Sequence, residues 1–129
     1  MDHWTVSIRS LKFLGDKTLA SGLQKIYTEV TVQIGNPSQV GATLNRMILD
    51  ISYQGRKVAQ LVKTESVDIK PNSTVALTLQ VAVDSAAFVG VAKKAIAEFI
   101  ASGNLKYHFR GDLFFNIGKL HLDETETVI

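Results

Sequence analysis

The chain has 129 residues, 46% of them hydrophobic, which suffices for one domain whose core needs no disulfide or metal. It has no cysteine, which excludes disulfides, thiolate metal sites and cysteine nucleophiles. With 14 basic and 12 acidic residues the net charge is +2, too balanced to indicate a nucleic-acid or anionic-membrane partner. No segment is apolar over the ~20 residues that a membrane span needs, and the N-terminus lacks the apolar region of a secretory signal. We therefore expect a cytoplasmic protein, or one incorporated into a particle that assembles inside the cell.

The N-terminal third predicts two β-strands, because apolar and polar residues alternate there. The first strand covers residues 4–8, and a looser segment with the turn signal Gly15-Asp16 follows. The second strand covers residues 25–34 and ends at Asn36-Pro37, since proline has no N–H for a ladder. Its predicted inward face consists of Ile26, Thr28, Val30, Val32 and Ile34.

The middle of the chain predicts three further strands. Residues 44–53 form one, with Met47, Leu49, Ile51 and Tyr53 on one face, and Gln54-Gly55 is a hairpin turn. Residues 57–63 form the next, with a bulge, because their apolar positions do not keep a period of two. Residues 74–83 alternate most regularly and place Val75, Leu77, Leu79, Val81 and Val83 inward.

After Val83 the period changes to that of a helix. Asp84-Ser85 offers N-cap side chains, and apolar residues then recur at i, i+3 and i+4 until Gly103. We predict one helix over residues 86–102. It is followed by a strand over 105–115, a turn at 116–118, a short strand over 119–122, and an acidic, frayed C-terminal tail over 123–129.

These elements predict a mainly β fold. We expect an antiparallel, immunoglobulin-like β-sandwich of about seven strands over residues 1–122, with one helix inserted before the last strands. A sandwich of this kind has strand edges and end loops as its contact surfaces.

The chain resembles the group-2 late-embryogenesis-abundant family, whose module is also called the water-stress and hypersensitive-response domain. The matching features are the valine-rich strand ending in Asn36-Pro37, the run from Leu49 to Ala59, the turn over residues 69–73 and the alternating strand that follows. The resemblance extends over residues 4–122 and rests on spacing and turns.

The resemblance implies a fibronectin-type-III-like sandwich without catalytic activity, linked to stress protection, membrane association or partner binding. Members of the family commonly carry an N-terminal anchor or signal peptide, which this sequence does not show. The same module also serves as a structural unit in larger assemblies, virus particles included.

Reactive side chains do not gather in the sequence. His3, His108 and His121 lack partners at metal-ligand spacing, and we expect no metal or cofactor. Asp50 and Asp68 are better explained as strand carboxylates that pair with neighbouring basic residues. No nucleophile or phosphate-binding loop is recognisable, so we expect no enzyme and no small-molecule substrate.

Candidate contact residues for a protein partner or for self-assembly come from two places. Phe114 and Phe115 are adjacent and must point to opposite faces of a strand, while Ile48 lies opposite Met47 and Leu49. An alternative of equal weight is that the inserted helix covers them. In the tail, Asp123, Glu124 and Glu126 are the candidates. The sequence thus favours a non-catalytic binding or protective module, with a structural subunit of a larger assembly such as a virus particle as the alternative.

Overall fold

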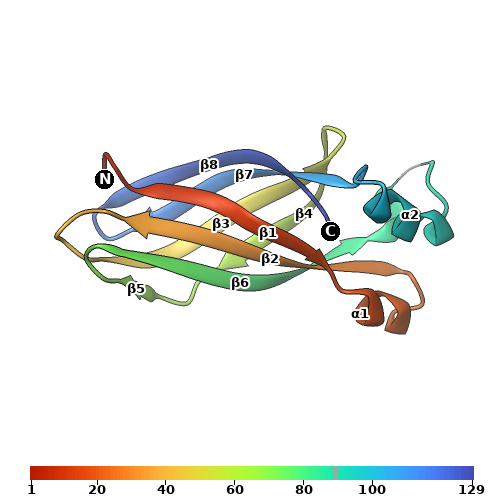
Figure 1. Cartoon of the computed structure of the whole chain (residues 1–129), viewed down its shortest axis with the longest axis horizontal. Coiled ribbons are helices and arrows are strands. Elements are labelled where there is room, and N and C mark those ends of the chain that lie inside the picture. The colour runs from red at the N-terminus through yellow and green to blue at the C-terminus, as the bar shows by residue number, and fades with distance from the viewer. Residues whose placement is uncertain (89) are drawn as a thin grey trace.

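The computed structural model describes residues 1–88 and 90–129 and consists mainly of two antiparallel β-sheets (Figure 1). The smaller sheet has the strand order β1-β2-β6, and the larger has the order β4-β3-β7-β8, with β5 also paired to β3. The bounds of the strands are β1 Thr5–Phe13, β2 Lys25–Asn36, β3 Ala42–Tyr53, β4 Arg56–Lys63, β5 Val67–Ile69, β6 Ser73–Asp84, β7 Lys106–Phe115 and β8 Gly118–Thr127.

The strand predictions are confirmed in position, although β1 extends five residues further than expected, to Phe13, and β8 extends to Thr127. The short strand β5 was not predicted, so the described residues form eight strands where about seven were expected. Asn36 ends β2, and Gln54 and Gly55 form the hairpin turn with φ values of 50° and 79°. Both residues of a two-residue hairpin turn of this type need a positive φ, which glycine adopts without strain. The turn fixes where β3 and β4 begin to pair.

The core lies between the sheets and follows the predicted alternation. Buried side chains from both sheets include Val30, Val32, Ile34, Leu49, Ile51, Val81, Val83, Phe109 and Leu113. Leu77 and Leu79 were also expected there but are only partly buried. They belong to β6, which is the edge of its sheet, so no strand pairs with β6 on its outer side.

Two strands of the larger sheet approach each other closely at Gly111. A Cβ atom at this position would lie 2.0 Å from the Ile48 carbonyl oxygen and 2.9 Å from the Leu49 Cα. Gly111 therefore allows β7 to lie against β3, as expected for a glycine inside a strand.

The predicted helix over residues 86–102 is wrong as one element; residue 89 within it lies outside the described residues. The structure has single 3-10 turns at Ser85–Ala87 and Lys93–Ala95, and then the short helix α2, Ile96–Ala101. Gly90, with a φ of 82°, interrupts the segment. The side chain of Asp84 nevertheless accepts a hydrogen bond from the Ala86 N–H, as the N-cap pattern predicted.

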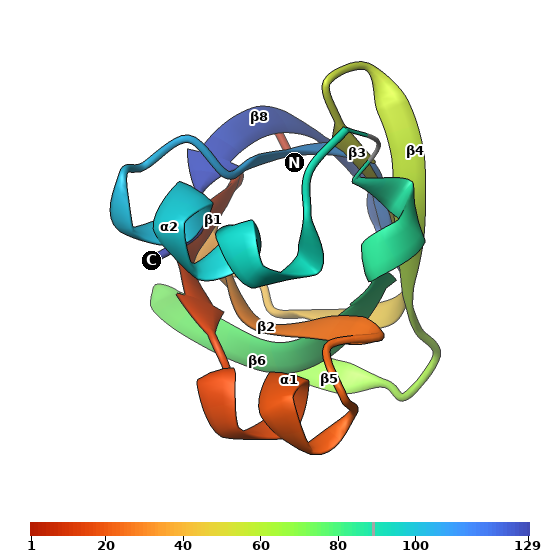
Figure 2. The same cartoon turned by 90° about the vertical axis from the view of Figure 1, so that its right-hand side faces the viewer.

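A second short helix, α1 (Gly15–Ala20), occupies the segment that was expected to be loose. α1 and α2 lie at one end of the sandwich and leave its sheet faces uncovered (Figures 1 and 2). Both are six residues long, and no helix among the described residues can cross a bilayer.

Candidate binding surface

The outward face of the larger sheet carries an apolar patch. The strand register places Ile48 beside Val62 of β4, and Arg46 beside Phe114 of β7. Val62 is 51% exposed, while Ile48 and Phe114 are half-buried. We call these four residues the outer patch.

Arg46 covers part of the aromatic ring in this patch. Its guanidinium carbon lies 4.6 Å from the centre of the Phe114 ring, which is a cation–π distance. Lys119 of β8 pairs with Phe114 from the other side. Apolar side chains with an arginine and an aromatic ring among them are the composition that protein interfaces favour.

The predicted contact residues Phe114, Phe115 and Ile48 divide between the two faces. Phe114 and Ile48 lie on the outward face. Phe115 points inward, is 7% exposed and packs edge-to-face on Trp4 at 5.3 Å between ring centres. Phe115 is therefore a core residue. The alternative that the helical segment covers Phe114 and Ile48 is wrong, because that segment lies at the end of the sandwich (Figure 1).

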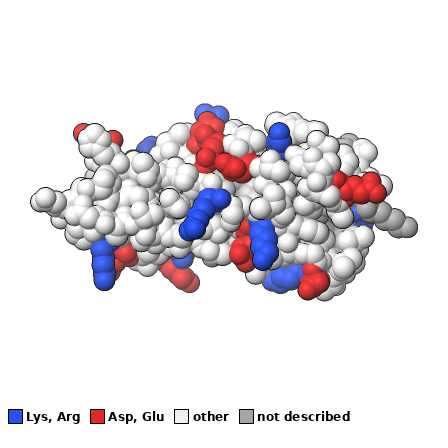
Figure 3. All heavy atoms as spheres, in the orientation of Figure 1, with Lys and Arg blue, Asp and Glu red and all other residues white. Residues whose placement is uncertain are grey.

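The predicted frayed tail is wrong, because residues 123–127 form the second half of β8 and pair with β7. Asp123 points outward, while Glu124 and Glu126 are half-buried. The Glu124 carboxylate accepts a hydrogen bond from the backbone N–H of Ile8 on β1. Among the three predicted acidic contact residues, Asp123 thus remains on the outer face, and Glu124 is engaged within the fold. Figure 3 shows acidic side chains gathered over β8, with basic ones beside them.

Two histidine–aspartate pairs bridge β7 and β8 on the same face. The His108 Nε2 lies 2.5 Å from Asp123 Oδ1, and His121 Nδ1 lies 3.0 Å from Asp112 Oδ1. The hydrogen bond from His108 is the main cause that lowers the pKa of Asp123, with Arg110 also contributing. Both pairs lie on the solvent-facing side of the sheet, so they are surface contacts between neighbouring strands.

Asp50 and Asp68 do not come together. The Asp50 carboxylate accepts a hydrogen bond from Gln60 at 2.8 Å and lies 3.2 Å from the Lys57 ammonium group. These two contacts lower the pKa of Asp50. Asp68 accepts a hydrogen bond from the Thr43 hydroxyl at 2.9 Å. Among the described residues, no three histidine or acidic side chains gather as metal ligands.

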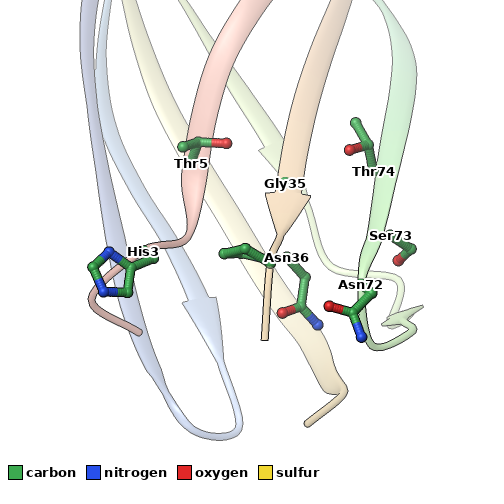
Figure 4. A pocket seen from close by; sticks show the side chains of 8 residues that line it. His3, Thr5, Gly35, Asn36, Asn72, Ser73 and Thr74 are labelled. Carbon is green, nitrogen blue, oxygen red and sulfur yellow. The ribbon is translucent and has the colours of Figure 1, made fainter. Parts of the chain in front are cut away.

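An open surface depression of about 430 Å³ lies at the end of the sandwich away from the helices, with His3 at its rim (Figure 4). Its central side chain, Asn36, is 2% exposed. The Asn36 amide donates to the carbonyls of Val40 and Lys70, both at 3.0 Å, and its oxygen accepts from the backbone and hydroxyl of Ser38. Asn36 therefore ties together the loops at this end and has no free polar group for a ligand.

Sequence reasoning missed Arg46 and Val62. Their neighbours across the strands depend on register. Arg46 meets Phe114 next to an irregularity in the β3–β7 pairing. The bulge predicted within residues 57–63 is present and shifts the pairing of β3 with β4 by one residue between Ile51 and Ser52. Counting back from the Gln54-Gly55 turn without that bulge would put Leu61 beside Ile48, whereas Leu61 is in fact buried.

Solved structures of low sequence identity share this fold. One is a protein from Archaeoglobus fulgidus, with a TM-score of 0.55, 15% identity and 94% of each chain covered. Another is a candidate ApaA protein from Bordetella pertussis, with a TM-score of 0.58 and 12% identity over 96% of this chain and 90% of that one. A candidate late embryogenesis abundant protein solved in solution has a TM-score of 0.58 and 10% identity over 98% of this chain and 70% of that one.

No curated protein sequence matches the chain at a significant level. The family model described as late embryogenesis abundant protein matches residues 31–125, well over half of the chain. This region begins within β2 and ends within β8, so it includes the larger sheet except for the last two residues of β8. The chain therefore belongs to the late embryogenesis abundant protein family.

Proposed function

We propose that the chain is a non-catalytic protective or binding module that works by contact, with the outer patch as its contact surface. The observation that carries this proposal is the outward position of exposed Val62 and half-buried Ile48 and Phe114 beside Arg46 on the larger sheet. Membership of the late embryogenesis abundant family supports a protective role.

We also infer the finer type of the sandwich and of the family. The strand order β1-β2-β6 facing β4-β3-β7-β8 supports an immunoglobulin or fibronectin type III arrangement, in which two such sheets pack face to face. The resemblance of residues 49–59 to the water-stress and hypersensitive-response domain supports the group-2 branch.

A role without chemistry is supported by where the acid–base pairs lie. His108–Asp123 and His121–Asp112 lie on the outward face of the larger sheet, and catalysis needs such groups positioned around a bound substrate. A protein partner and a cytoplasmic location stay predictions. Nothing in the described residues or in the related structures favours the alternative of a particle subunit.

The test is protection of a heat-labile client enzyme, with aggregation followed by light scattering. We expect the wild-type chain to suppress aggregation and Phe114→Glu to lose most of that effect, because a carboxylate replaces the ring beneath Arg46. Gln33→Glu is the matched control, since it adds the same charge to the outward face of the smaller sheet.

Equal protection by wild type and Phe114→Glu, with both proteins folded by circular dichroism, would overturn the outer patch as the contact surface. Absence of protection by the wild type would overturn the protective role itself.

A further inference from the structure

The two long sides of the sandwich differ in how their edge strands are protected. On one side β1 and β8 are joined: Glu124 accepts from the Ile8 N–H, the Phe13 N–H donates to the Ile129 carbonyl at 2.6 Å, and the Ile129 N–H donates to Leu11 at 2.9 Å. We call these three contacts the seam. On the other side β4 and β6 face each other without pairing, across a groove of about 370 Å³.

The β6 edge lacks the devices that usually prevent strands from pairing with other molecules. From Ser73 to Val83 it contains no charged residue, proline or glycine, and its twelve residues pair with β2 without a bulge. In contrast, β1 and β4 both have bulges in their pairing, and β4 carries Arg56, Lys57 and Lys63. A long, regular and uncharged edge is a template for another strand.

The same strand exposes apolar surface on its inward side. Val75, Leu77 and Leu79 are half-buried, whereas their partners on β2 (Ile34, Val32 and Val30) are fully buried. A strand added beside β6 would cover these three side chains as well as the unpaired backbone groups. The added strand must itself be apolar at alternate positions.

We infer that β6 of a second copy of this chain is that strand, paired antiparallel about a twofold axis. The charges at the two ends of β6 support a second copy: Asp84 ends the strand, and Lys70 lies just before it begins. In an antiparallel pair each Asp84 approaches the end where Lys70 of the other copy lies, so both ends are complementary at once.

This arrangement also predicts the register. The apolar side chains set this register: Leu77 faces Leu77, and Val75 faces Leu79 on either side of it. Each Asp84 is then directed towards the turn before β6 of the other copy, where Lys70 lies. All three half-buried side chains then meet on one face, because residues directly opposite share a face in an antiparallel pair. The two smaller sheets would join into one continuous sheet.

The first test measures the mass of the full chain in solution by light scattering after gel filtration, over a wide range of concentrations. We expect the wild type to approach twice its 14.1 kDa mass as concentration rises. The double variant Ala76→Lys/Thr78→Lys should lose the dimer, because this register puts the two lysines of opposite copies side by side. Thr31→Lys/Gln33→Lys, on the central strand β2, should keep it.

The second test uses the absence of cysteine from the chain. Leu77→Cys should form a disulfide-linked dimer under mild oxidation, since it faces itself across the axis at a distance that a disulfide can bridge. Thr125→Cys, exposed on β8 at the far edge of the other sheet, should remain unlinked.

A wild type that stays monomeric at every concentration overturns the inference, as does a dimer that survives the β6 lysines. Cross-linking of Thr125→Cys as fast as Leu77→Cys would show unspecific encounter and has the same consequence. Phe114→Glu lies on the opposite sheet and should leave the dimer intact, so failure of this inference and of the proposed function are distinguishable.

Discussion

Two hydroxyl groups lie in the otherwise apolar space between the sheets. Thr28 of β2 and Tyr107 of β7 are both fully buried, and neither hydroxyl makes a hydrogen bond of normal geometry. Burial raises the pKa of Tyr107 to about 12, against the smaller lowering effect of nearby Thr28. The neutral phenol is therefore the form that the folded chain favours, and it packs in a cluster with Phe88 and Phe109.

Replacing this tyrosine should change how stability depends on alkaline pH. With a folded pKa of about 12 and an unfolded value near 10.0, Tyr107 stabilises the fold fully below pH 10, and this contribution is lost as pH rises towards 12. Between these pH values the wild type should lose on the order of 2 kcal/mol of unfolding free energy that Tyr107→Phe does not lose. Urea titrations at neutral and alkaline pH measure it, with Tyr27→Phe as control.

The double variant Thr28→Val/Tyr107→Phe removes both buried hydroxyls at once. Its free energy of unfolding at neutral pH should lie within about 1 kcal/mol of the wild type, because no unpaired partner remains. An unchanged alkaline dependence in Tyr107→Phe would contradict the assignment of the raised pKa to this residue.

At the scale of elements, position in the sheet decides how deeply an inward-facing residue is buried. Leu49 lies on β3, a central strand, and is fully buried, whereas Leu79 lies on the edge strand β6 and is only partly buried. The alternation of apolar residues is equally regular in both strands. Equal patterns in the sequence therefore correspond to unequal contributions to stability.

Truncation of these two leucines should show the difference. Leu49→Ala should cost about 2–5 kcal/mol of unfolding free energy, the usual range for a core position. Leu79→Ala should cost about 1–2 kcal/mol, since part of its side chain is already in contact with water. Denaturant titration of both variants, at a concentration where the chain is monomeric, measures the two losses. Equal losses at that concentration would contradict the shallower burial of Leu79.

Strands and turns were predictable from the sequence because their signals are local. Val30, Val32, Leu49 and Ile51 keep a period of two, and Gln54-Gly55 permits one kind of hairpin. The break in the helix predicted over residues 86–102 could not be predicted. The apolar spacing of this segment fits a helix, whereas Gly90 adopts a positive φ in the fold. Local pattern cannot reveal a break that tertiary packing imposes.

At the scale of the whole molecule, the acidic segment over residues 123–127 depends on partners that are distant in the sequence and could not be predicted from it. Asp123, Glu124 and Glu126 read as a solvated tail because acidic residues disfavour strands. In the fold they belong to β8, and Glu124 finds its partner, the Ile8 N–H, 116 positions away. The pairing of Val62 with Ile48 in the outer patch could not be predicted either, because it depends on the bulge that shifts the register of β3 and β4.

Removal of the chain after Leu122 should therefore destabilise the molecule. It deletes half of β8, the buried Val128 side chain and all three contacts of the seam. We expect the thermal midpoint to fall by about 10 °C or more, since a loss of 1 kcal/mol shifts it by a few degrees. Glu124→Gln keeps the acceptor for Ile8 and should shift it little. Calorimetry of the truncated chain and of Glu124→Gln measures both midpoints. An unchanged midpoint in the truncated chain would show that residues 123–129 do not stabilise the fold.

The seam also bears on when the molecule can complete its fold. All strands of the smaller sheet lie before residue 85, and β3 and β4 form a local hairpin, so most pairings need only moderate loop closure. The seam instead joins positions that are nearly the full chain apart. Contacts of such separation are entropically the costliest to form early, so the seam belongs to the last steps of folding. We therefore expect the seam to lower the unfolding rate of the folded chain and to have little effect on its folding rate.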